Sequence, residues 1–312
     1  MTLLVKFLRR AAVAVVILGV LFGLGYLGGW LYFIVVAALS LTALNEYYSA
    51  VARRGIRADV YLGWLCTVMV LLVTQIGEDV RLLAGPPQSP SLEAGVAVAT
   101  AADVLQLTLF VLLFCVAGTL VSQFKLKGEG SAVVNSAATV FGVVWVGILL
   151  SFMLRIRYLD IPALAGVEGA SEFSRRLGAL VLVIGSVWLC DTMAYLGGNL
   201  LGRTKLAPTV SPNKTVEGSI CGFVAAIIGA VIIGVWLGLP ARHCVLLGAM
   251  MGVLGQIGDL GKSVLKRDLG IKDFSSLFGP HGGVLDRFDA ILVCMPLVYW
   301  YFWFFWLAPR LS

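Results

Sequence analysis

Long apolar segments recur along this sequence, and they constrain its fold more than any other feature. Several of them reach or approach the ~20 residues that a helix needs to cross a bilayer. Of the 312 residues, 60% are hydrophobic and only 13% are charged, whereas a typical soluble domain has roughly 25% charged residues. A soluble fold of this size would need far more polar surface. The sequence therefore predicts an all-α integral membrane protein.

Hydropathy predicts about nine membrane-spanning helices. The apolar run from Ala11 to Tyr48 is too long for one helix, and we expect the glycine-rich stretch GYLGGW to break it into two. The spans are expected near residues 11–26, 29–46, 60–76, 103–122, 133–154, 177–198, 218–238, 243–260 and 288–308. We interpret residues 1–176 as an N-terminal scaffold of about five spans and residues 177–312 as a catalytic C-terminal region. The C-terminal region contains two polar loops, at 199–217 and 261–287.

Lys and Arg residues are distributed unevenly between the two sides of these spans. If the N-terminus lies in the cytoplasm, sixteen of the 23 basic residues fall in cytoplasmic segments. This bias predicts a multi-pass protein of the cell membrane with a cytoplasmic N-terminus and both polar loops in the cytoplasm. The bias also accounts for the net charge of +6, so no nucleic-acid partner is expected. The six cysteines form no CxxC pair, and we expect neither disulfides nor a zinc site.

Acidic residues of the C-terminal half gather at span edges and in loops on one side of the membrane. Seven of the seventeen acidic residues lie from Asp191 onward, namely Asp191, Glu217, Asp259, Asp268, Asp273, Asp286 and Asp289. Both long polar loops of this half fall on the same side as these residues. The convergence indicates a single site in the C-terminal half.

The first polar stretch is DTMAYLGGNLLGRTKLAPTVSPNKTVEGSICG. Its SPNKT segment predicts a helix start with Ser211 as the N-cap. A helix N-terminus is a site for anions, and Lys214 adds a positive charge beside it. Gly218 and Gly222 form a small-xxx-small face that would serve either packing within the chain or dimerisation. A basic loop followed by a packing helix would explain this stretch equally well.

The second polar stretch, GQIGDLGKSVLKRDLGIKDFSSLFGPHGGVLDRFDA, combines carboxylates with basic residues. Asp259 shares a helical face with Lys262 and Ser263, and Asp286 and Asp289 project to one side of the last span. The three aspartates offer the oxygen ligands that Mg²⁺ prefers. Carboxylates for a metal beside cations for oxyanions are typical of phosphoryl or nucleotidyl transfer. A structural ion pair that anchors the helix at the interface is the alternative.

The segment SVLKRDLGIKDFSSLFGPHGGVLDRFD resembles the signature of the phosphatidate cytidylyltransferases, also called CDP-diacylglycerol synthases. The matching residues are Ser263, Lys266, Arg267, Lys272, Asp273, His281, Gly282, Gly283, Asp286, Arg287 and Asp289. The upstream segments D-T-x-A-Y, S-P-x-K-T-x-E-G and G-Q-x-G-D resemble the same family, so the likeness covers roughly the C-terminal 120 residues. One departure is the turn before His281, where Gly279-Pro280 replaces the family's Pro-Gly. We expect a changed loop shape there and retained activity.

The resemblance implies transfer of a cytidylyl group from CTP to phosphatidate in phospholipid biosynthesis, which gives CDP-diacylglycerol and pyrophosphate. It implies a homodimer and a magnesium ion, which potassium can accompany, at a metal site formed by Asp259, Asp286 and Asp289. The catalytic residues it implies are these three aspartates with Lys266 and Arg267. The substrate-binding residues it implies are Asp191, Ser211, Lys214, Glu217, Ser263, Lys272, Asp273, His281 and Arg287.

Two other functions remain open at this point. A CTP-dependent prenyl-lipid nucleotidyltransferase of the CDP-archaeol type would use much of the same equipment. A polytopic cation transporter could also own intramembrane carboxylates, but it would place them near mid-span on broken helices. The carboxylates here are expected at span ends that face one compartment, which favours the transferase.

Overall fold

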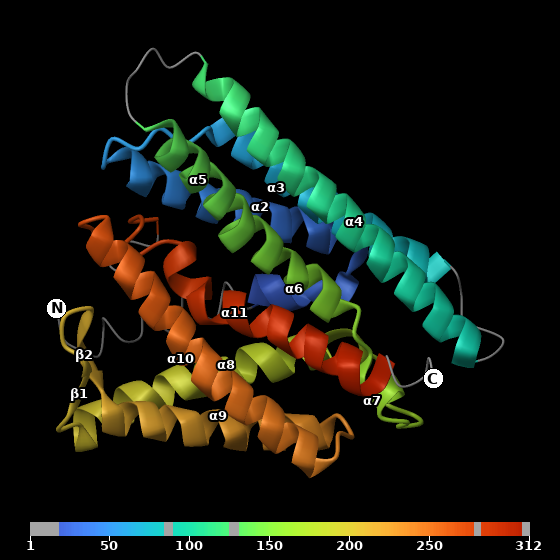
Figure 1. The fold of residues 1–312 in the computed structure, drawn as a ribbon. Coiled ribbons are helices and arrows are strands. Elements are labelled where there is room, and N and C mark those ends of the chain that lie inside the picture. Colours follow the sequence, from blue (N-terminus) through green and yellow to red (C-terminus); the bar gives the residue numbers. More distant parts are fainter. Residues whose placement is uncertain (1–18, 84–89, 125–130, 278–281, 308–312) are drawn as a thin grey trace.

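The part of the chain that the structure describes is almost entirely helical (Figure 1). This computed structural model covers residues 19–83, 90–124, 131–277 and 282–307. After a helical segment at 19–27, the helices in chain order are α2 (Gly29–Ala52), α3 (Val60–Leu83), α4 (Pro90–Gln123), α5 (Ala132–Gly142), the π-helix η1 (Val143–Ile148), α6 (Leu149–Arg157), α7 (Ile161–Leu164), α8 (Glu172–Leu201), α9 (Val216–Trp236), α10 (Ala241–Asp268), α11 (Leu285–Phe302) and the π-helix η3 (Trp303–Leu307). The strands β1 (Lys205–Ala207) and β2 (Ser211–Thr215) form an antiparallel hairpin between α8 and α9.

Eight helices in the described ranges are long and apolar enough to cross a membrane, which confirms the prediction of an all-α membrane protein with about nine spans. Residues 11–18 of the span expected at 11–26 lie outside those ranges, and residues 19–26 are helical. The expected break at GYLGGW is confirmed, because Gly28 and Gly29 have φ angles of 68° and 56°. Glycine adopts this left-handed conformation without strain.

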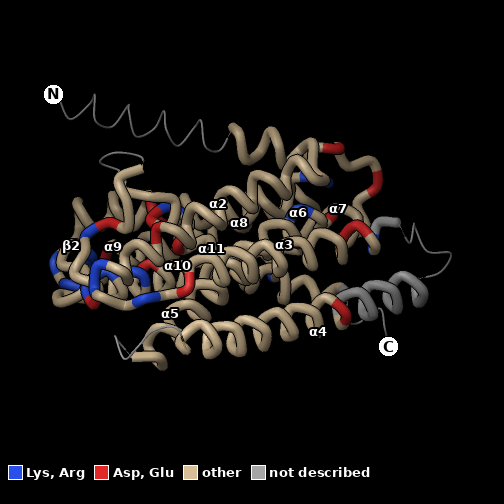
Figure 2. Tube along the Cα trace, turned by 90° about the horizontal axis from the view of Figure 1, so that it is seen from above, with Lys and Arg blue, Asp and Glu red and all other residues tan. Residues whose placement is uncertain are grey.

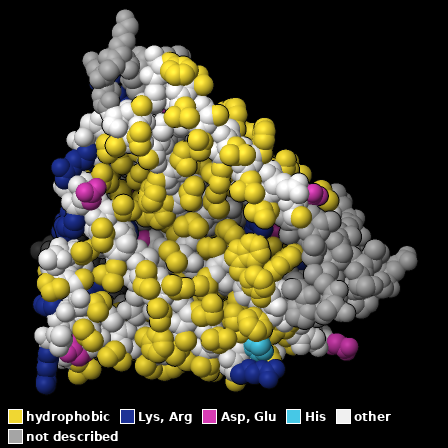
Figure 3. Space-filling model, viewed as in Figure 1, with side chains coloured by type: hydrophobic (Ala, Val, Ile, Leu, Met, Phe, Trp, Pro, Cys, Tyr) yellow, Lys and Arg dark blue, Asp and Glu magenta, His cyan; other side chains and the backbone are white. Residues whose placement is uncertain are grey.

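The molecular surface also indicates a membrane setting. Hydrophobic side chains cover the broad face seen in Figure 3, and Lys and Arg lie mainly at its edges. Large apolar side chains in the middle of helices are well exposed, such as Leu113 at 69% and Ile232 at 65%. Contiguous apolar surface on this scale indicates contact with lipid. The protein is therefore a multi-pass membrane protein.

The helices form two packed groups, and α11 connects them (Figure 1). In the first group, α3 packs against α4, α2 and the η1 segment, and in the second, α9 packs against both α8 and α10. Helix α11 contacts α10 and α8 of the second group and α6 and α2 of the first. Most of its residues are buried, including Asp289 near its start. The helix that carries two predicted site aspartates is thus part of the core.

Helices α8 and α9 approach each other closely because glycines face the contact. A Cβ added to Gly218 would lie 2.6 Å from the carbonyl oxygen of Ala194 and 2.9 Å from the Cα of Gly198. A Cβ on Gly222 would lie 2.8 Å from the carbonyl oxygen of Cys190. All three neighbouring atoms belong to backbone, which cannot move aside cheaply. The small-residue face of Gly218 and Gly222 therefore serves packing within the chain.

Replacing Gly218 by alanine is expected to lower the free energy of unfolding by about 1–3 kcal/mol, the usual cost of forcing extra atoms into a packed contact. Thermal unfolding of detergent-solubilised protein, followed by intrinsic fluorescence, measures the effect. Gly261→Ala is the matched control, because an added Cβ at this helical glycine has no neighbour within 4 Å. Equal melting temperatures for the two variants would contradict the close α8–α9 contact.

The prediction that Ser211 caps a helix is wrong. Ser211–Thr215 forms β2, which pairs with β1 through Lys205 opposite Thr215. Helix α9 begins four residues later than that cap would require, because the Thr215 hydroxyl accepts the backbone N–H of Gly218 at 3.2 Å. The anion site expected at a helix starting at Ser211 is therefore absent from this hairpin strand, although Lys214 still lies directly before the helix.

The predicted loop at 261–287 begins too early. Helix α10 continues to Asp268, and the turn follows at Gly270, whose φ angle is 67°. No glycine or proline between Lys262 and Asp268 interrupts the helix, and Lys262 and Leu269 remain buried on its inner face. The site residues from Lys262 to Arg267 are consequently fixed on a helix rather than on a loop.

Candidate active site

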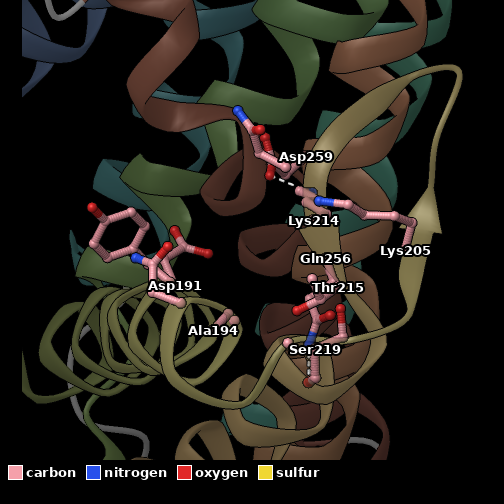
Figure 4. A pocket seen from close by; sticks show the side chains of 13 residues that line it. Asp191, Ala194, Lys205, Lys214, Thr215, Ser219, Gln256 and Asp259 are labelled. Carbon is pink, nitrogen blue, oxygen red and sulfur yellow. Dashed lines mark hydrogen bonds and ion pairs between the residues drawn. The ribbon is translucent and has the colours of Figure 1, made fainter.

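A cavity lies where α8, α9 and α10 meet the β-hairpin, at the end of the helices where basic residues gather (Figure 2). Its volume is about 650 Å³. In Figure 4 the Asp191 side chain comes from α8 and lies across the cavity from the joined side chains of Lys214 and Asp259. The polar residues that line the cavity include Asp191, Asn199, Lys205, Lys214, Gln256 and Asp259. Three of the predicted site residues thus line one cavity.

Ion pairs join the hairpin to α10 inside this cavity. Lys214 Nζ of β2 lies 2.5 Å from Asp259 Oδ2, and Lys262 Nζ lies 3.3 Å from Asp259 Oδ1. Asp259 and Lys262 share a helical face, as their spacing predicts. Asp191 of α8 is close enough to interact electrostatically with both Asp259 and Lys214. The cavity therefore brings carboxylates and ammonium groups from three elements together.

Lys262 extends this cluster into the core between α10 and α11. Its ammonium group forms an ion pair with Asp289 and donates a hydrogen bond to the carbonyl oxygen of Asp286 at 3.1 Å. The side chains of Lys262 and Asp289 are only 7% and 9% exposed. A buried charge is costly unless it is paired, so each of these side chains stabilises the other. Asp259 and Asp289 consequently lie around one ammonium group.

The Asp286 carboxylate is held by three donors of its own chain. Its Oδ1 accepts a hydrogen bond from Lys266 Nζ at 2.9 Å. Its Oδ2 accepts from the backbone N–H groups of Phe274 and Gly283, at 3.0 and 3.1 Å. A carboxylate in the first turn of α11 also suits the positive end of the helix dipole. These contacts organise the chain before α11, and metal binding by Asp286 stays a prediction.

Arg267 and Glu217 hold the hairpin at its two ends. Arg267 Nε donates to the carbonyl oxygen of Val210 in the hairpin turn at 3.1 Å. Glu217, in the first turn of α9, accepts from the backbone N–H groups of Arg203 and Thr204 at 3.1 Å each. Direct contact of Arg267 and Glu217 with substrate stays a prediction. Their contacts within the chain shape the hairpin that carries Lys205 and Lys214.

Several predicted substrate-binding residues are not among the described residues that line this cavity. They are Ser211, Glu217, Ser263, Lys272, Asp273 and Arg287. Ser263 Oγ instead donates to the carbonyl oxygen of Asp259 at 2.8 Å, and Asp273 lies 3.9 Å from Lys266. His281 and the Gly279-Pro280 pair lie outside the described residues. The substrate-binding role of these side chains stays a prediction.

Sequence reasoning missed three contributors to this region. It paired Lys262 with Asp259 but did not include the lysine among the site residues. Gln256 lines the cavity, and its Nε2 donates to the carbonyl oxygen of Ser219 at 2.9 Å, which links α10 to α9. Glu46 of α2 reaches the start of α11. An acidic residue in an apolar span is itself a signal of function, and Glu46 could have been found in this way.

The chemistry of the cluster fits a magnesium ion. No group of three or more His, Cys, Asp or Glu side chains in the described ranges is arranged to hold a metal. Mg²⁺, however, is usually bound by one or two carboxylates together with substrate phosphates and waters. Asp259 and Asp289 supply two such carboxylates on neighbouring helices. The ammonium groups of Lys214 and Lys262 neutralise the negative charge of these two carboxylates, which a bound cation would neutralise in their place.

Comparison with known proteins shows the family to which the chain belongs. Residues 8–305 match the sequence profile described as the cytidylyltransferase family. The chain is 30% identical to a phosphatidate cytidylyltransferase of Synechocystis, over 94% of this chain and 95% of that protein. It is 29% identical to phosphatidate cytidylyltransferase 4, chloroplastic, of Arabidopsis thaliana, over 87% and 67%. A Bacillus subtilis phosphatidate cytidylyltransferase is 36% identical over a shorter match, 50% of this chain and 54% of that protein.

The fold and the site define a polytopic membrane protein with a carboxylate and lysine cluster at the end of its helices. The match over nearly the whole chain shows that it belongs to the cytidylyltransferase family. The resemblance read from the C-terminal motifs is confirmed, and it extends over the N-terminal spans as well.

Proposed function

We propose that this protein transfers the cytidylyl group of CTP to phosphatidate and releases pyrophosphate. A phosphate oxygen of phosphatidate forms a bond to the α-phosphorus of CTP, and the bond from that phosphorus to the bridging oxygen of the β-phosphate breaks. The observation that carries this proposal is the Asp259–Lys262–Asp289 cluster, in which Lys262 and Asp289 are buried, beside a polar cavity at the end of the helices where basic residues gather. The names of the relatives support the choice of lipid.

The side chains of the cluster have separate roles in this proposal. Asp259 and Asp289 hold Mg²⁺, with Asp286 as the third predicted ligand and potassium as a companion ion. When bound, Mg²⁺ neutralises charge on the transferring and leaving phosphate oxygens. Lys214 attracts the anionic CTP into the cavity, because its ammonium group lies on the cavity wall. Lys266 and Arg267 add positive charge along the same end of α10.

The arrangement of the protein in its membrane is also part of the proposal. Lys and Arg gather at the hairpin end of the helices (Figure 2), which supports a cytoplasmic location of that end and of the N-terminus. CTP would then enter from the cytoplasm of a cell whose membrane supplies the lipid, and the acyl chains would stay in the bilayer. A homodimer is proposed on the resemblance to the family alone.

Purified protein in detergent is expected to form CDP-diacylglycerol and pyrophosphate in a one-to-one ratio from CTP and phosphatidate. Omitting either substrate, or chelating Mg²⁺ with EDTA, should abolish both products. Chromatographic identification of the lipid product, together with a pyrophosphate assay, measures the reaction. A prenyl-ether phosphate lipid in place of phosphatidate separates the alternative substrate class. Turnover of only the prenyl lipid would contradict the proposal, and so would ion movement without CTP turnover.

A further inference from the structure

A carboxylate from the N-terminal half caps the helix that carries Asp286 and Asp289. Glu46 of α2 accepts hydrogen bonds from the backbone N–H groups of Val284 and Leu285, at 3.0 and 2.9 Å. The N-cap position of α11 is Val284, whose side chain cannot accept such a bond, and no side-chain cap comes from that residue. Glu46 thus satisfies N–H groups that a helix start otherwise leaves unpaired.

Glu46 is enclosed by its partners. It is only 5% exposed, and its Oε1 also accepts a hydrogen bond from Ser275 Oγ at 2.6 Å. A Cβ added to Gly283 would overlap the Glu46 carboxylate, so glycine at this position permits the approach. A negative charge at this point suits the positive N-terminal end of α11. The carboxylate is therefore fixed at the start of α11 by several partners.

The same end of α2 is also joined to α10. Arg54 Nη2, eight residues after Glu46, donates to the carbonyl oxygen of Asp268 at 2.7 Å. A Cβ added to Gly270 would lie 2.7 Å from the Arg54 guanidinium. A cation suits the negative C-terminal end of α10. One segment of the N-terminal half thus binds the C-terminal end of α10 and the N-terminal end of α11, the two helices that contribute Asp259 and Asp289.

We propose that Glu46 is a positioning residue for the transfer site, which it serves by holding the first turn of α11. Leu285 precedes Asp286 directly, and Asp286 in turn binds the N–H of Gly283. Two carboxylates therefore fix three successive residues: Asp286 holds the N–H of Gly283, and Glu46 holds those of Val284 and Leu285. The orientation of the first turn decides where the Asp289 carboxylate lies relative to Asp259. This inference rests on the proposed transferase function for its catalytic consequence, but the capping contact can be tested without it.

The test compares wild type, Glu46→Gln, Glu46→Asp and the control Glu78→Gln. An amide at position 46 places an N–H₂ group against a backbone donor and removes the negative charge, so α11 should lose its cap. Amide deuterium exchange of residues 282–292 is expected to rise in Glu46→Gln. Turnover should fall by about 10- to 100-fold, since small displacements of catalytic groups have effects of this size. The Mg²⁺ concentration for half-maximal turnover should rise severalfold.

The variants separate positioning from general stability. Glu78 of α3 is similarly buried, at 7% exposed, and Glu78→Gln should leave both the exchange and the Mg²⁺ midpoint unchanged. Glu46→Asp keeps the charge and should restore part of the turnover. A purely structural role would reduce the amount of active protein without moving the Mg²⁺ midpoint. Unchanged exchange of residues 282–292 in Glu46→Gln would overturn the inference, as would an unmoved midpoint. If wild type releases no pyrophosphate, the proposed function fails, while the exchange still decides whether Glu46 caps α11.

Discussion

Replacing Asp289 by asparagine is expected to lower turnover by about 10³-fold, the size of effect seen when a group that stabilises transition-state charge is removed. The amide has nearly the same shape, but it carries no charge for a cation and cannot pair with Lys262. Lys262 keeps its contact with Asp259, so the protein should remain folded. Steady-state pyrophosphate release at saturating CTP and phosphatidate measures the loss.

The matched control for this variant is again Glu78→Gln. Both positions carry a carboxylate that is nearly excluded from solvent, since the whole residues Glu78 and Asp289 are 7% and 8% exposed. Glu78 lies on α3, where its ion-pair partner is Arg81 rather than any residue of the cavity. Near-normal turnover of Glu78→Gln would show that the loss in Asp289→Asn is specific to the cluster. Loss of less than about tenfold in Asp289→Asn would contradict a place for this carboxylate at the reacting centre.

Replacing Lys262 by methionine is expected to give the largest loss of stability, about 3–5 kcal/mol in the free energy of unfolding. Asp259 would keep Lys214 as a partner, but Asp289 would become a buried carboxylate without a cation. The cost is that of the unpaired charge, not of the missing ammonium group alone. Unfolding of the purified protein in detergent, followed by fluorescence, measures it.

A second substitution tests the cause of that loss. The double variant Lys262→Met, Asp289→Leu removes both buried charges and should recover much of the stability that Lys262→Met loses. Lys205→Met is the control for the lysine, because Lys205 is exposed and its substitution should change stability by less than about 0.5 kcal/mol. Additive losses in the double variant would show that the pairing of Lys262 with Asp289 does not matter for stability.

The sequence predicted the membrane architecture well because hydropathy is a local property. Each described span coincides with an apolar run of sufficient length. Gly28 and Gly29 break the first long apolar run because glycine readily adopts positive φ angles. The start of α9 was predicted wrongly because Ser211 and Thr215 are both good N-cap residues. The choice between them depends on the pairing of β2 with β1, which involves residues that local signals do not connect.

Only the parts of the candidate site that follow from local spacing were predicted. The shared face of Asp259 and Lys262 follows from helical spacing, and it is present. The spacing of Asp286 and Asp289 suggested a common task, but their ammonium partners are different, Lys266 and Lys262 respectively. Those partners lie on another helix. Glu46 is more distant still, 238 residues from Val284, and no periodicity in the sequence connects two such positions.

The central claim is that the carboxylates around Lys262 hold the metal of the transfer site. Binding of Mn²⁺, which suits the same oxygen ligands as Mg²⁺, tests this claim most directly when it is followed by electron paramagnetic resonance in the presence of CTP. Wild type and Glu78→Gln are expected to bind Mn²⁺ with the same affinity, and Asp289→Asn is expected to lose the bound signal. Binding by Asp289→Asn with the affinity of wild type would contradict the claim and move the metal away from Asp289.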